Sequence, residues 1–518
     1  MTHSYTNNHK TILGVGGALN HDASISIVKG NEILFASHSE RYSKIKNDPL
    51  LNSELIHDAL QYGTPDVIAW YENPWKKKAR QLWAGQYSLA FDKEELPKRY
   101  LQQFPELRGI PVEYQDHHYS HAASGYHTSG FVNAAVVVID SIGEWETLTI
   151  WQGTGGKLSK VYSQGYPHSF GLFYSAMTQR LGLKAQEDEY ILMGMAAYGD
   201  ANRKYKGKYL KHQLMNELGI MHHHDKLHTF KQNLHRGCNW IFPDLTSEQD
   251  LFDLAAATQE VYEILFDRVI KLAHQIVSFS TNLVLMGGCA LNCKANSTVT
   301  SNYGFKDIWI MPNPGDAGSS IGVAQKYNRA DWNLNWKTPY LGHNIEGEYP
   351  VEKALQHLLN GEIVGIANGR AEFGPRALGN RTLTADPRGP LIKDKMNEIK
   401  RRQKFRPFAP MILEEDVHEY FEMPTNINQS PYMQFVAKCK HPKEFPAIIH
   451  KDGTSRVQTV NQLQHPDLYL LLQRFKESTG CPMLVNTSLN IKGQPIVNDL
   501  ADAIEFEQHY GIKVHVGD

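Results

Sequence analysis

The first 150 residues contain the same hydrophobic pattern twice. In each copy, three apolar runs follow one another and are separated by polar or glycine-containing turns. The first copy consists of the runs at 11–17, 23–30 and 32–40, and the second of the runs at 134–144, 146–156 and 157–163. Apolar runs of this length between such turns predict β-strands. We therefore expect two β-β-β units, each opening with a buried strand that leads into a Gly- and Asp-rich turn.

The repetition predicts an internal duplication. An actin-like (ribonuclease H-like) α/β unit has this layout, and its turns are suited to holding phosphates or a metal ion. Two ordinary hairpins would give the same pattern and remain the alternative.

The middle of the chain is predicted to be mostly helical between residues 163 and 271. The clearest amphipathic run is LFDLAAATQEVYEILFDRVIKLAHQIV at 251–277, in which apolar residues recur at helical spacing. Buried strands that end in glycine turns are expected at 282–292 and 308–320, and the second turn leads into a helix.

A boundary between two domains is expected around residue 340. Residues 331–350 show neither helical nor strand periodicity and carry Trp, Asn, Pro and Gly, as linkers do. A helix at 351–360 and a strand at 362–369 follow. The predicted domains are therefore 1–340 and 341–518, and both are α/β.

Composition and charge exclude several classes of protein. The 518 residues are 41% hydrophobic and 21% charged, which is typical of globular chains and excludes disorder, collagen and a coiled-coil rod. No apolar run approaches the roughly 18 residues that cross a bilayer, and the first residues lack a signal-peptide layout. We expect a soluble, cytoplasmic protein with no membrane partner. The five cysteines contain no C-x-x-C pair, so core thiols are expected.

A metal site is predicted from the segment HHYSHAASGYH at 117–127. His117 and His121 share one face of a helix and can bind one ion, whereas His118 points elsewhere. Asp140 ends an apolar strand and Asp316 lies in a glycine turn, where α/β folds gather their sites. Two imidazoles and two carboxylates suit Fe²⁺, Mn²⁺ or Zn²⁺. A histidine pair without any ligand remains the alternative.

The segment MHHHDKLH at 221–228 also contains a histidine cluster. It is polar and lies in a stretch of weak periodicity, so a solvated loop is predicted there rather than a metal site.

A second cluster is basic. Residues 369–406 contain eleven Lys or Arg and four Asp or Glu, a net charge of +7, so the rest of the chain carries −9 against −2 for the whole. Glycines 369, 374 and 379 let backbone N–H groups approach an anion, and arginine binds phosphate through two donors. A phosphate-rich small ligand fits this composition. A solvated basic face or a nucleic-acid patch remains the alternative, although the arginines lie in turns rather than along one helix.

Ten segments resemble one known family. They are HDASISIV, HHYSHAASGYH, VVVIDSIGE, LMGMAAYGD, MGGCALNCKAN, NPGDAGSSIG, GRAEFGPRALGNR, KFRPFAPMIL, DGTSRVQTV and LVNTSLNIKGQPIV. Together they are similar to the O-carbamoyltransferases of the nodulation-factor, cephamycin and aminoglycoside type. The resemblance runs from about Gly14 to Val497.

The resemblance implies an enzyme of two domains. The N-terminal domain would be actin-like and related to the tRNA threonylcarbamoyl-transfer protein, and the C-terminal domain would have the YrdC-like fold of threonylcarbamoyl-adenylate synthase. The C-terminal domain would convert carbamoyl phosphate and ATP, with Mg²⁺, into carbamoyl-adenylate. The N-terminal domain would then pass the carbamoyl group to an alcohol.

The same resemblance implies roles for individual residues. His117, His121, Asp140 and Asp316 would bind iron or a similar ion, and His21 and Lys46 would line the transfer site, with His21 as the candidate base. Carbamoyl phosphate and the nucleotide would be bound by Arg376, Lys400, Arg406, Arg456, Asn486 and Ser488. The adenylate would bind in the transfer domain at Gly287, Gly288 and Gly315. The chain departs from the family pattern at Ser141, Ile191 and Gln403, where relatives carry Gly, Lys and Glu.

Two other functions stay open from the sequence. One is modification of nucleic acid, such as carbamoylation of a hydroxymethylated base, and the other is a non-enzymatic nucleotide-binding module. Neither the acceptor nor the oligomeric state can be predicted.

Overall fold

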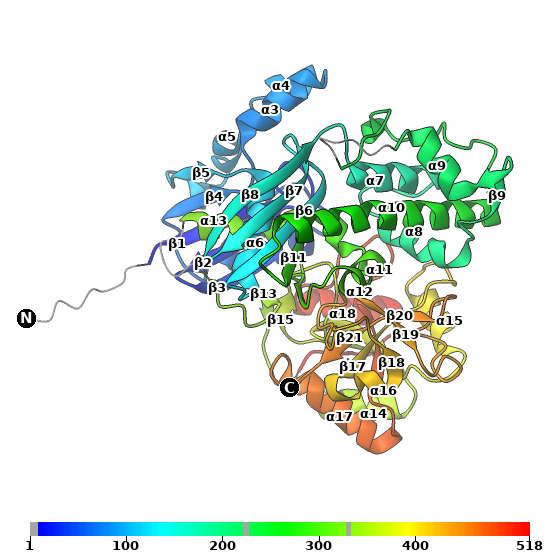
Figure 1. The fold of residues 1–518 in the computed structure, drawn as a ribbon. Helices are drawn as coiled ribbons and strands as arrows, with labels where there is room; N and C mark the ends of the chain where they lie inside the picture. The colour runs from blue at the N-terminus through cyan, green and yellow to red at the C-terminus, as the bar shows by residue number, and fades with distance from the viewer. Residues whose placement is uncertain (1–8, 221–226, 328–332, 518) are drawn as a thin grey trace, which may run out of the picture.

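The computed structural model describes residues 9–220, 227–327 and 333–517. Figure 1 shows two sheets and their helices in the N-terminal part, and a third, separate sheet with its own helices in the C-terminal part. The protein is thus a mixed α/β molecule of two domains.

The first sheet is built from the first predicted copy. Its strands are β1 (Thr11–Gly16), β2 (Ser24–Lys29), β3 (Glu32–His38), β4 (Val67–Trp70) and β5 (Val112–Tyr114), in the order β3-β2-β1-β4-β5. β1 pairs antiparallel with β2 and parallel with β4. β2 pairs antiparallel with β3, and β4 pairs parallel with β5.

The second sheet repeats this plan. Its strands are β6 (Asn133–Gly143), β7 (Glu146–Thr154), β8 (Lys157–Gly165), β11 (Asn282–Met286) and β12 (Asp307–Trp309), in the order β12-β11-β6-β7-β8. β6 takes the place of β1, with antiparallel pairing to β7 and parallel pairing to β11. Because five strands agree in order and direction, the predicted duplication is confirmed and two unrelated hairpins are excluded.

Two helices fill the space between these sheets. They are α6 (His117–Thr128) and α13 (Ser319–Tyr327), and their apolar side chains join one core with those of β1, β6 and β11. Close packing depends on glycine: a Cβ on Gly322 of α13 would lie 2.1 Å from the carbonyl oxygen of Ser120 in α6, and one on Gly14 would lie 1.9 Å from that of Ser320. The helices therefore bring their N-terminal ends, which carry polar residues, to one place.

Helices on the outer face of the second sheet build another core. They are α7 (Phe170–Arg180), α8 (Glu189–Met195), α9 (Leu210–Leu218) and α10 (Glu248–Ile276), and α10 spans this layer in Figure 1. α10 begins at a capping box, in which the Ser247 hydroxyl accepts the N–H of Asp250. The helical stretch predicted between 163 and 271 is confirmed. The short elements of this part are η2 (Ala196–Tyr198), β9 (Lys204–Tyr205), β10 (Lys208–Tyr209), η3 (Leu234–Arg236), η4 (Gly288–Leu291), α11 (Cys293–Asn296), α12 (Val299–Asn302) and η5 (Asp316–Gly318).

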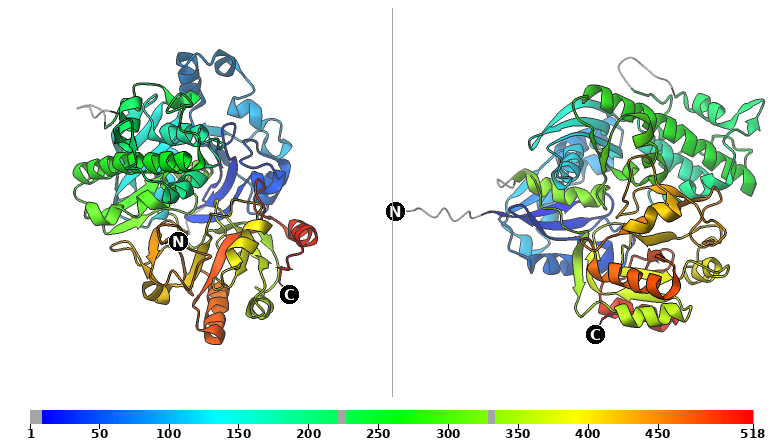
Figure 2. Two further views of the ribbon diagram at one scale, coloured as in Figure 1. Left: turned by 90° about the vertical axis from the view of Figure 1, so that its right-hand side faces the viewer. Right: turned by 60° about the horizontal axis from the view of Figure 1, so that its bottom comes forward.

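The segment between β3 and α6 carries short helices in addition to β4 and β5. It contains α1 (Glu40–Ser43), α2 (Ser53–Leu60), α3 (Pro74–Trp83), α4 (Tyr87–Phe91), α5 (Pro97–Leu101) and η1 (Pro105–Leu107). α3 and α4 project from the body of the molecule, as Figure 1 and the left view of Figure 2 show.

The C-terminal domain is organised around a six-stranded mixed sheet of order β21-β17-β22-β16-β14-β23. Its strands are β14 (Val364–Ala367), β16 (Arg381–Ala385), β17 (Ala409–Leu413), β21 (Gln458–Val460), β22 (Met483–Ser488) and β23 (Val514–His515). The helices are α14 (Val351–Leu359), α15 (Ile392–Ile399), η6 (Glu414–Asp416), α16 (Val417–Tyr420), α17 (Pro466–Thr479) and α18 (Leu500–Tyr510). A small sheet consists of β18 (Phe421–Glu422), β19 (Val436–Cys439) and β20 (Thr454–Arg456). The hydrophobic core of the C-terminal domain is separate from the cores of the N-terminal domain.

One expectation about the linker is wrong. Residues 331–350 were expected to lack a strand, but β13 (Tyr340–Ile345) lies within them and pairs antiparallel with β15 (Gly369–Glu372). The pairing register shifts between Tyr340 and Asn344, and this irregularity removes the regular alternation of apolar and polar residues that would have predicted the strand.

Two compositional expectations can be compared with the structure. Among the described residues, no helix has both the length and the apolar character that crossing a membrane requires. All five cysteines are free thiols; four are buried and Cys289 is half-buried. The prediction of core thiols is confirmed for these four.

Candidate active site

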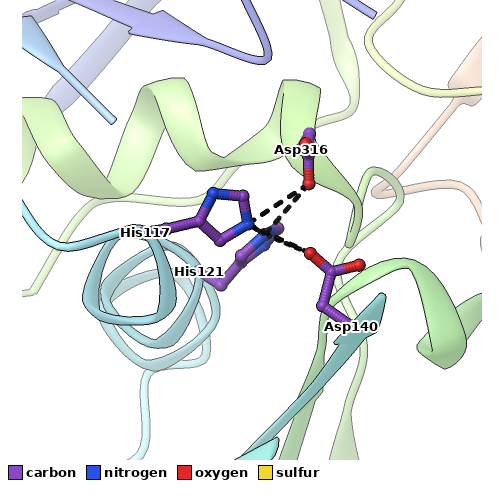
Figure 3. A group of neighbouring side chains, drawn as sticks. All are labelled: His117, His121, Asp140 and Asp316. Atoms are coloured by element: carbon purple, nitrogen blue, oxygen red, sulfur yellow. Dashed lines mark hydrogen bonds and ion pairs between the residues drawn. The ribbon is translucent and has the colours of Figure 1, made fainter. Parts of the chain in front are cut away.

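Four side chains from distant parts of the sequence converge between the two N-terminal sheets (Figure 3). The Nε2 atom of His117 lies 3.0 Å from Asp140 Oδ2 and 3.5 Å from Asp316 Oδ1. The Nε2 atom of His121 lies 3.3 Å from Asp316 Oδ1 and 3.7 Å from Asp140 Oδ2. One ligand atom from each of the four residues lies within 4.8 Å of all the others. We call this group the His/Asp cluster.

The fold explains why these residues meet. His117 and His121 occupy the first two turns of α6, so both face the same direction. Asp140 lies near the end of β6, where pairing with β7 becomes irregular. Asp316 opens η5, directly before α13, and a Cβ on Gly318 in this turn would lie only 1.7 Å from the Asn313 carbonyl oxygen. A tight turn that only glycine allows therefore sets the position of the second carboxylate.

The electrostatics of the His/Asp cluster favour a cation. Burial lowers the pKa of His117, but Asp316 and Asp140 raise it by more, so its pKa stands well above the usual value. Burial raises the pKa of Asp316, and the two histidines lower it well below the usual value. The two Nε2 atoms face each other at 3.1 Å, and each Nδ1 is buried with no hydrogen-bond partner among the described residues. Two ring nitrogens and two carboxylates directed at one point fit a divalent ion.

The three glycines expected to bind the adenylate border this cluster. Gly287 follows β11 with φ +88°, and a Cβ there would lie 2.1 Å from the Ile139 carbonyl oxygen. At Gly288 a Cβ would lie 3.4 Å from Asp140 Oδ1. Gly315 immediately precedes Asp316 and has open space where a Cβ would stand. The backbone can thus come close to a ligand beside both carboxylates.

The predicted transfer residues His21 and Lys46 lie in the turns that follow β1 and α1. His21 is half-buried, and its Nε2 lies 3.1 Å from the Gln186 carbonyl oxygen. Its neighbour Asn20 donates to Asp316 Oδ2 at 3.4 Å, which places this turn beside the His/Asp cluster. Lys46 is paired with the buried Glu40 at 2.8 Å.

Sequence reasoning missed Glu144. Its carboxylate is buried, and it accepts the backbone N–H groups of Asn73 and His117. Burial raises the pKa of Glu144 to about 7. The only signal in the sequence was its place at the end of the motif VVVIDSIGE, four residues after Asp140.

A second group of charged side chains lies where the C-terminal domain meets α8 and α11. It comprises the half-buried arginines 376, 402, 406 and 456, which we call the arginine cluster. Burial and Arg456 lower the pKa of Arg376 to about 9, and burial and Arg406 hold that of Arg402 well below its usual value. Arg406 lies 4.7 Å above the ring of Tyr190 in α8. Within the described part of the chain, none of the four is ion-paired with a carboxylate.

Three of these arginines were predicted, and Arg402 was not. Its side chain donates to Asn397 Oδ1 at 2.6 Å and lies 4.0 Å above the Phe408 ring. In the sequence it stands among RRQKFR, where neighbouring positive charges do not reveal which one turns inward.

Lys400, Ser488 and Asn486 lie deeper in the same domain. The buried Lys400 ammonium donates to the carbonyl oxygen of Ser488 at 2.5 Å and to that of Asn490 at 2.6 Å. Burial, Arg402 and Arg406 hold its pKa well below the usual value. The Asn486 amide donates to the Ala377 carbonyl oxygen at 2.9 Å, so it positions the residue that follows Arg376.

Other charges of the +7 segment have structural partners. Arg381 is fully buried and donates to five backbone carbonyl oxygens. Arg388 is paired with Asp386 at 2.7 Å. The net charge of the segment therefore overstates the number of cations that are free to bind an anion.

The structure also bears on the remaining histidines and on the departures from the family pattern. His118 Nδ1 contacts Thr149 Oγ1 at 2.9 Å, away from the His/Asp cluster as predicted. Residues 221–226 of the second histidine segment lie outside the described residues. His228, which ends this segment, is fully buried, and its Nε2 lies 2.9 Å from the Gln164 amide. The predicted solvated loop is therefore wrong for this residue.

At the three positions that depart from the family pattern, Ile191 is buried in the core beside α10, while Ser141 and Gln403 are half-buried.

Comparison with known proteins identifies the family. The family models described as Carbamoyltransferase N-terminus and Carbamoyltransferase C-terminus match residues 71–325 and 355–517. The chain belongs to the carbamoyltransferase family. The resemblance stated from its motifs is thereby confirmed, and the protein is a transferase enzyme.

Relatives of this carbamoyltransferase extend over nearly its whole length. The uncharacterized protein sll1178 of Synechocystis is 33% identical and covers 95% of this chain and 93% of its own. The nodulation protein NolNO of Sinorhizobium fredii is 30% identical, over 96% of this chain and 78% of its own. The 3'-hydroxymethylcephem-O-carbamoyltransferase of Amycolatopsis lactamdurans is 27% identical, over 96% and 97%. A solved structure of HypF matches 61% of this chain at 15% identity and a TM-score of 0.34, a level at which it has no bearing on ligands.

Proposed function

We propose that this carbamoyltransferase makes carbamoyl-adenylate from carbamoyl phosphate and ATP and transfers the carbamoyl group to a hydroxyl of a small-molecule acceptor. In the first step, carbamoyl phosphate and water give carbamate and phosphate. The carbamate oxygen then bonds to the α-phosphorus of ATP, and pyrophosphate leaves. In the second step, the acceptor oxygen bonds to the carbamoyl carbon, the hydroxyl proton goes to a base, and AMP leaves.

The observation that carries the proposal is the arginine cluster. Among the described residues, the four guanidinium groups have no carboxylate partner and repel one another, and burial together with the neighbouring arginines lowers the pKa of Arg376, Arg402 and Arg456. Anionic phosphates relieve this repulsion, since arginine binds phosphate through charge-assisted hydrogen bonds. We assign carbamoyl phosphate and ATP to Arg376, Arg406 and Arg456, with Lys400, Asn486 and Ser488 supporting them.

The transfer step is assigned to the His/Asp cluster. His117, His121, Asp140 and Asp316 would hold a divalent ion, with Fe²⁺, Mn²⁺ and Zn²⁺ compatible with the donor set. Such an ion supplies Lewis-acid polarisation of a carbonyl or phosphoryl oxygen when it is bound. The backbone at Gly287, Gly288 and Gly315 would receive the adenylate, and burial of the cluster would keep water from the unstable carbamoyl-adenylate. His21 is proposed as the base and Lys46 as a cation of the same site.

We assign the two steps to two domains. Residues 1–340, with their duplicated sheets, would form the actin-like transfer domain, and residues 341–518 the YrdC-like adenylate-forming domain. The separate cores support this division, and the two family models match on either side of residue 340.

The first step can be tested without knowing the acceptor. The protein is mixed with ATP, Mg²⁺ and carbamoyl phosphate, and pyrophosphate release is measured for wild type, Arg376→Ala and Lys404→Ala. Lys404 is an exposed residue of the same basic segment and serves as the control. Removing one preorganised charged donor should reduce the rate about a hundredfold, so Arg376→Ala should be slow and Lys404→Ala should match wild type. A wild-type rate no higher than that of Arg376→Ala would refute the proposal.

A nucleic-acid acceptor is less well supported. Polynucleotide binding relies on exposed cations that contact phosphates, whereas Arg381, Lys400 and Arg388 are committed to carbonyl oxygens or to a carboxylate. No observation in the structure favours this second function.

A further inference from the structure

Helix α3 turns an apolar face towards solvent. Trp75 is 64% exposed, Leu82 is 40% exposed and Trp83 is 63% exposed, and Ala79 is exposed between them. These four residues, which we call the apolar stripe, follow the helical spacing i, i+4, i+7 and i+8, so they share one side of the helix. A helix normally buries such a side against its own core, whereas this one lies on a projecting part of the molecule (Figure 1).

The exposed apolar surface continues into α4, which packs against α3. Tyr87, Leu89 and Phe91 of α4 are 64%, 40% and 72% exposed. The four aromatic side chains of the two helices, at about 200 Å² each and about two thirds exposed, leave about 500 Å² uncovered. A protein in a stable complex buries about 800 Å² of its own surface, and Ala79 and the leucines add to the aromatic area. The surface on α3 and α4 is therefore close to the size that a stable dimer needs.

The helix that carries the apolar stripe is held in place from both ends. At its start, the Asn73 side chain accepts the N–H of Trp75, and the Asn73 backbone N–H donates to the buried Glu144 carboxylate. At its end, the Trp83 ring lies 5.7 Å from that of Trp145 and 5.9 Å from that of Tyr166. A face that is already ordered loses little conformational freedom on association, so the stripe is suited to binding a partner as it stands.

The lysines beside the apolar stripe have partners within their own chain. Lys76 pairs with Asp116 at 2.8 Å and Lys77 pairs with Glu72 at 2.7 Å, while Lys78 donates to two backbone carbonyl oxygens of the α4 segment. Two copies of this face can therefore meet without repulsion between free lysines. The same pairing disfavours an anionic membrane surface, because such a surface attracts free cations beside exposed aromatic residues.

The spacing of the apolar stripe is symmetric about its smallest residue. Trp75 and Trp83 each lie four residues from Ala79, which is about 6 Å along the helix axis in either direction. When a second α3 lies antiparallel to the first, Trp75 of each copy faces Trp83 of the other, and the two Ala79 side chains meet in the middle. A two-fold interface requires this kind of exchange, in which one surface is complementary to itself. The small side chain at the centre lets the two helices approach closely.

We propose that two copies of this chain associate through the apolar stripe, with their α3 helices antiparallel and Ala79 on the two-fold axis. The inference is independent of the proposed function. It predicts that a charge introduced at position 79 meets the same charge of the other copy, whereas opposite charges in two copies attract each other.

The test is the mass of the full-length protein in solution, measured by light scattering at concentrations from nanomolar to micromolar. Wild type is compared with Ala79→Glu, Ala79→Lys, an equimolar mixture of these two variants, and Leu463→Glu. Leu463 is 95% exposed between β21 and α17 of the C-terminal domain, so it is the control for adding a charge at an exposed apolar residue. The mixture also serves as the folding control, because misfolded variants cannot restore each other's association.

Wild type and Leu463→Glu should have twice the 58.8 kDa mass of one chain. Ala79→Glu and Ala79→Lys should each raise the dimer Kd about a hundredfold or more, because like charges placed face to face cost several kcal/mol, and the mixture should return to the mass of two chains. Wild type with the mass of one chain at every concentration would overturn the inference, and so would undiminished association of the separate Ala79 variants. A mixture that stays at the mass of one chain would exclude the two-fold axis at Ala79, and wild-type monomers that bind phosphatidylserine vesicles would assign the stripe to a membrane instead.

Discussion

Gly143 provides a sharp test of the His/Asp cluster. In a Gly143→Ala variant, the new Cβ would stand 2.3 Å from His117 Cδ2 and 2.8 Å from His118 Cδ2. Carbon atoms in contact prefer about 3.5 Å or more, so the His117 ring must move by about 1 Å. Protein ligands of a metal ion tolerate roughly 0.2 Å. We therefore expect Gly143→Ala to lose bound metal and carbamoyl transfer.

The control for this prediction is Gly153→Ala. Gly153 lies in β7, and a Cβ there would stand 2.5 Å from the Tyr126 ring, which belongs to α6 as His117 does. Overpacking at either position should cost about 1–3 kcal/mol of unfolding free energy, but only Gly143 faces a proposed ligand.

The assay is metal content by mass spectrometry after loading with Fe²⁺, Mn²⁺ or Zn²⁺, together with thermal unfolding and acceptor-free pyrophosphate release. Gly143→Ala should lack metal and keep the first step, whereas Gly153→Ala should keep both. Wild-type metal content in Gly143→Ala, or equal loss in both variants, would refute the reasoning.

Two further predictions concern the C-terminal domain. Burial lowers the pKa of His465 to about 4 from about 6.5 in the unfolded chain, so its contribution to stability is present above pH 6.5 and is lost as the pH falls towards 4. When the pH falls from 7.5 to 5.5, protonation of His465 in the unfolded chain should lower the free energy of unfolding by about 1 kcal/mol. Urea unfolding of His465→Gln should therefore depend less on pH than that of wild type. An unchanged pH dependence would contradict the lowered pKa of His465. Lys400→Met should abolish pyrophosphate release, because the ammonium that bridges the Ser488 and Asn490 carbonyl oxygens is lost. Metal content should stay at the wild-type value, and joint loss of both would indicate general unfolding instead.

The duplicated sheets were predictable because their signal is local. Each predicted run became a strand whose ends lie within two residues of the expected bounds. Burial of both faces of β1 and of most of β6 requires continuous apolar sequence there. β13 was missed because its register shifts. α3 and α4 were not predicted, and large aromatic side chains of both helices face solvent instead of a core. Trp75, Trp83 and Phe91 are each more than 60% exposed.

Convergence of the four His/Asp side chains was predictable from residue type and from strand ends. Which charges of the basic segment are free to bind an anion was not predictable from the sequence. Arg381 and Arg402 have the same formal charge, yet one is surrounded by carbonyl oxygens and the other joins the arginine cluster. Whether an arginine binds backbone carbonyl oxygens or joins the arginine cluster depends on its long-range contacts. These contacts cannot be predicted from the spacing of residues in the sequence.

The segment from Gly288 to Cys293 shows how two separate clusters can serve one reaction. Gly288 lies beside Asp140 at one end of this segment, and Cys293 lies within electrostatic reach of Arg376 and Arg456 at the other. Consecutive Cα atoms are 3.8 Å apart, so these ends are separated by at most about 19 Å. Under the proposed function, carbamoyl-adenylate formed at the arginine cluster would cover at most a distance of this order. A short path between the two clusters matters for an intermediate that water destroys, because it limits the time during which hydrolysis competes with transfer.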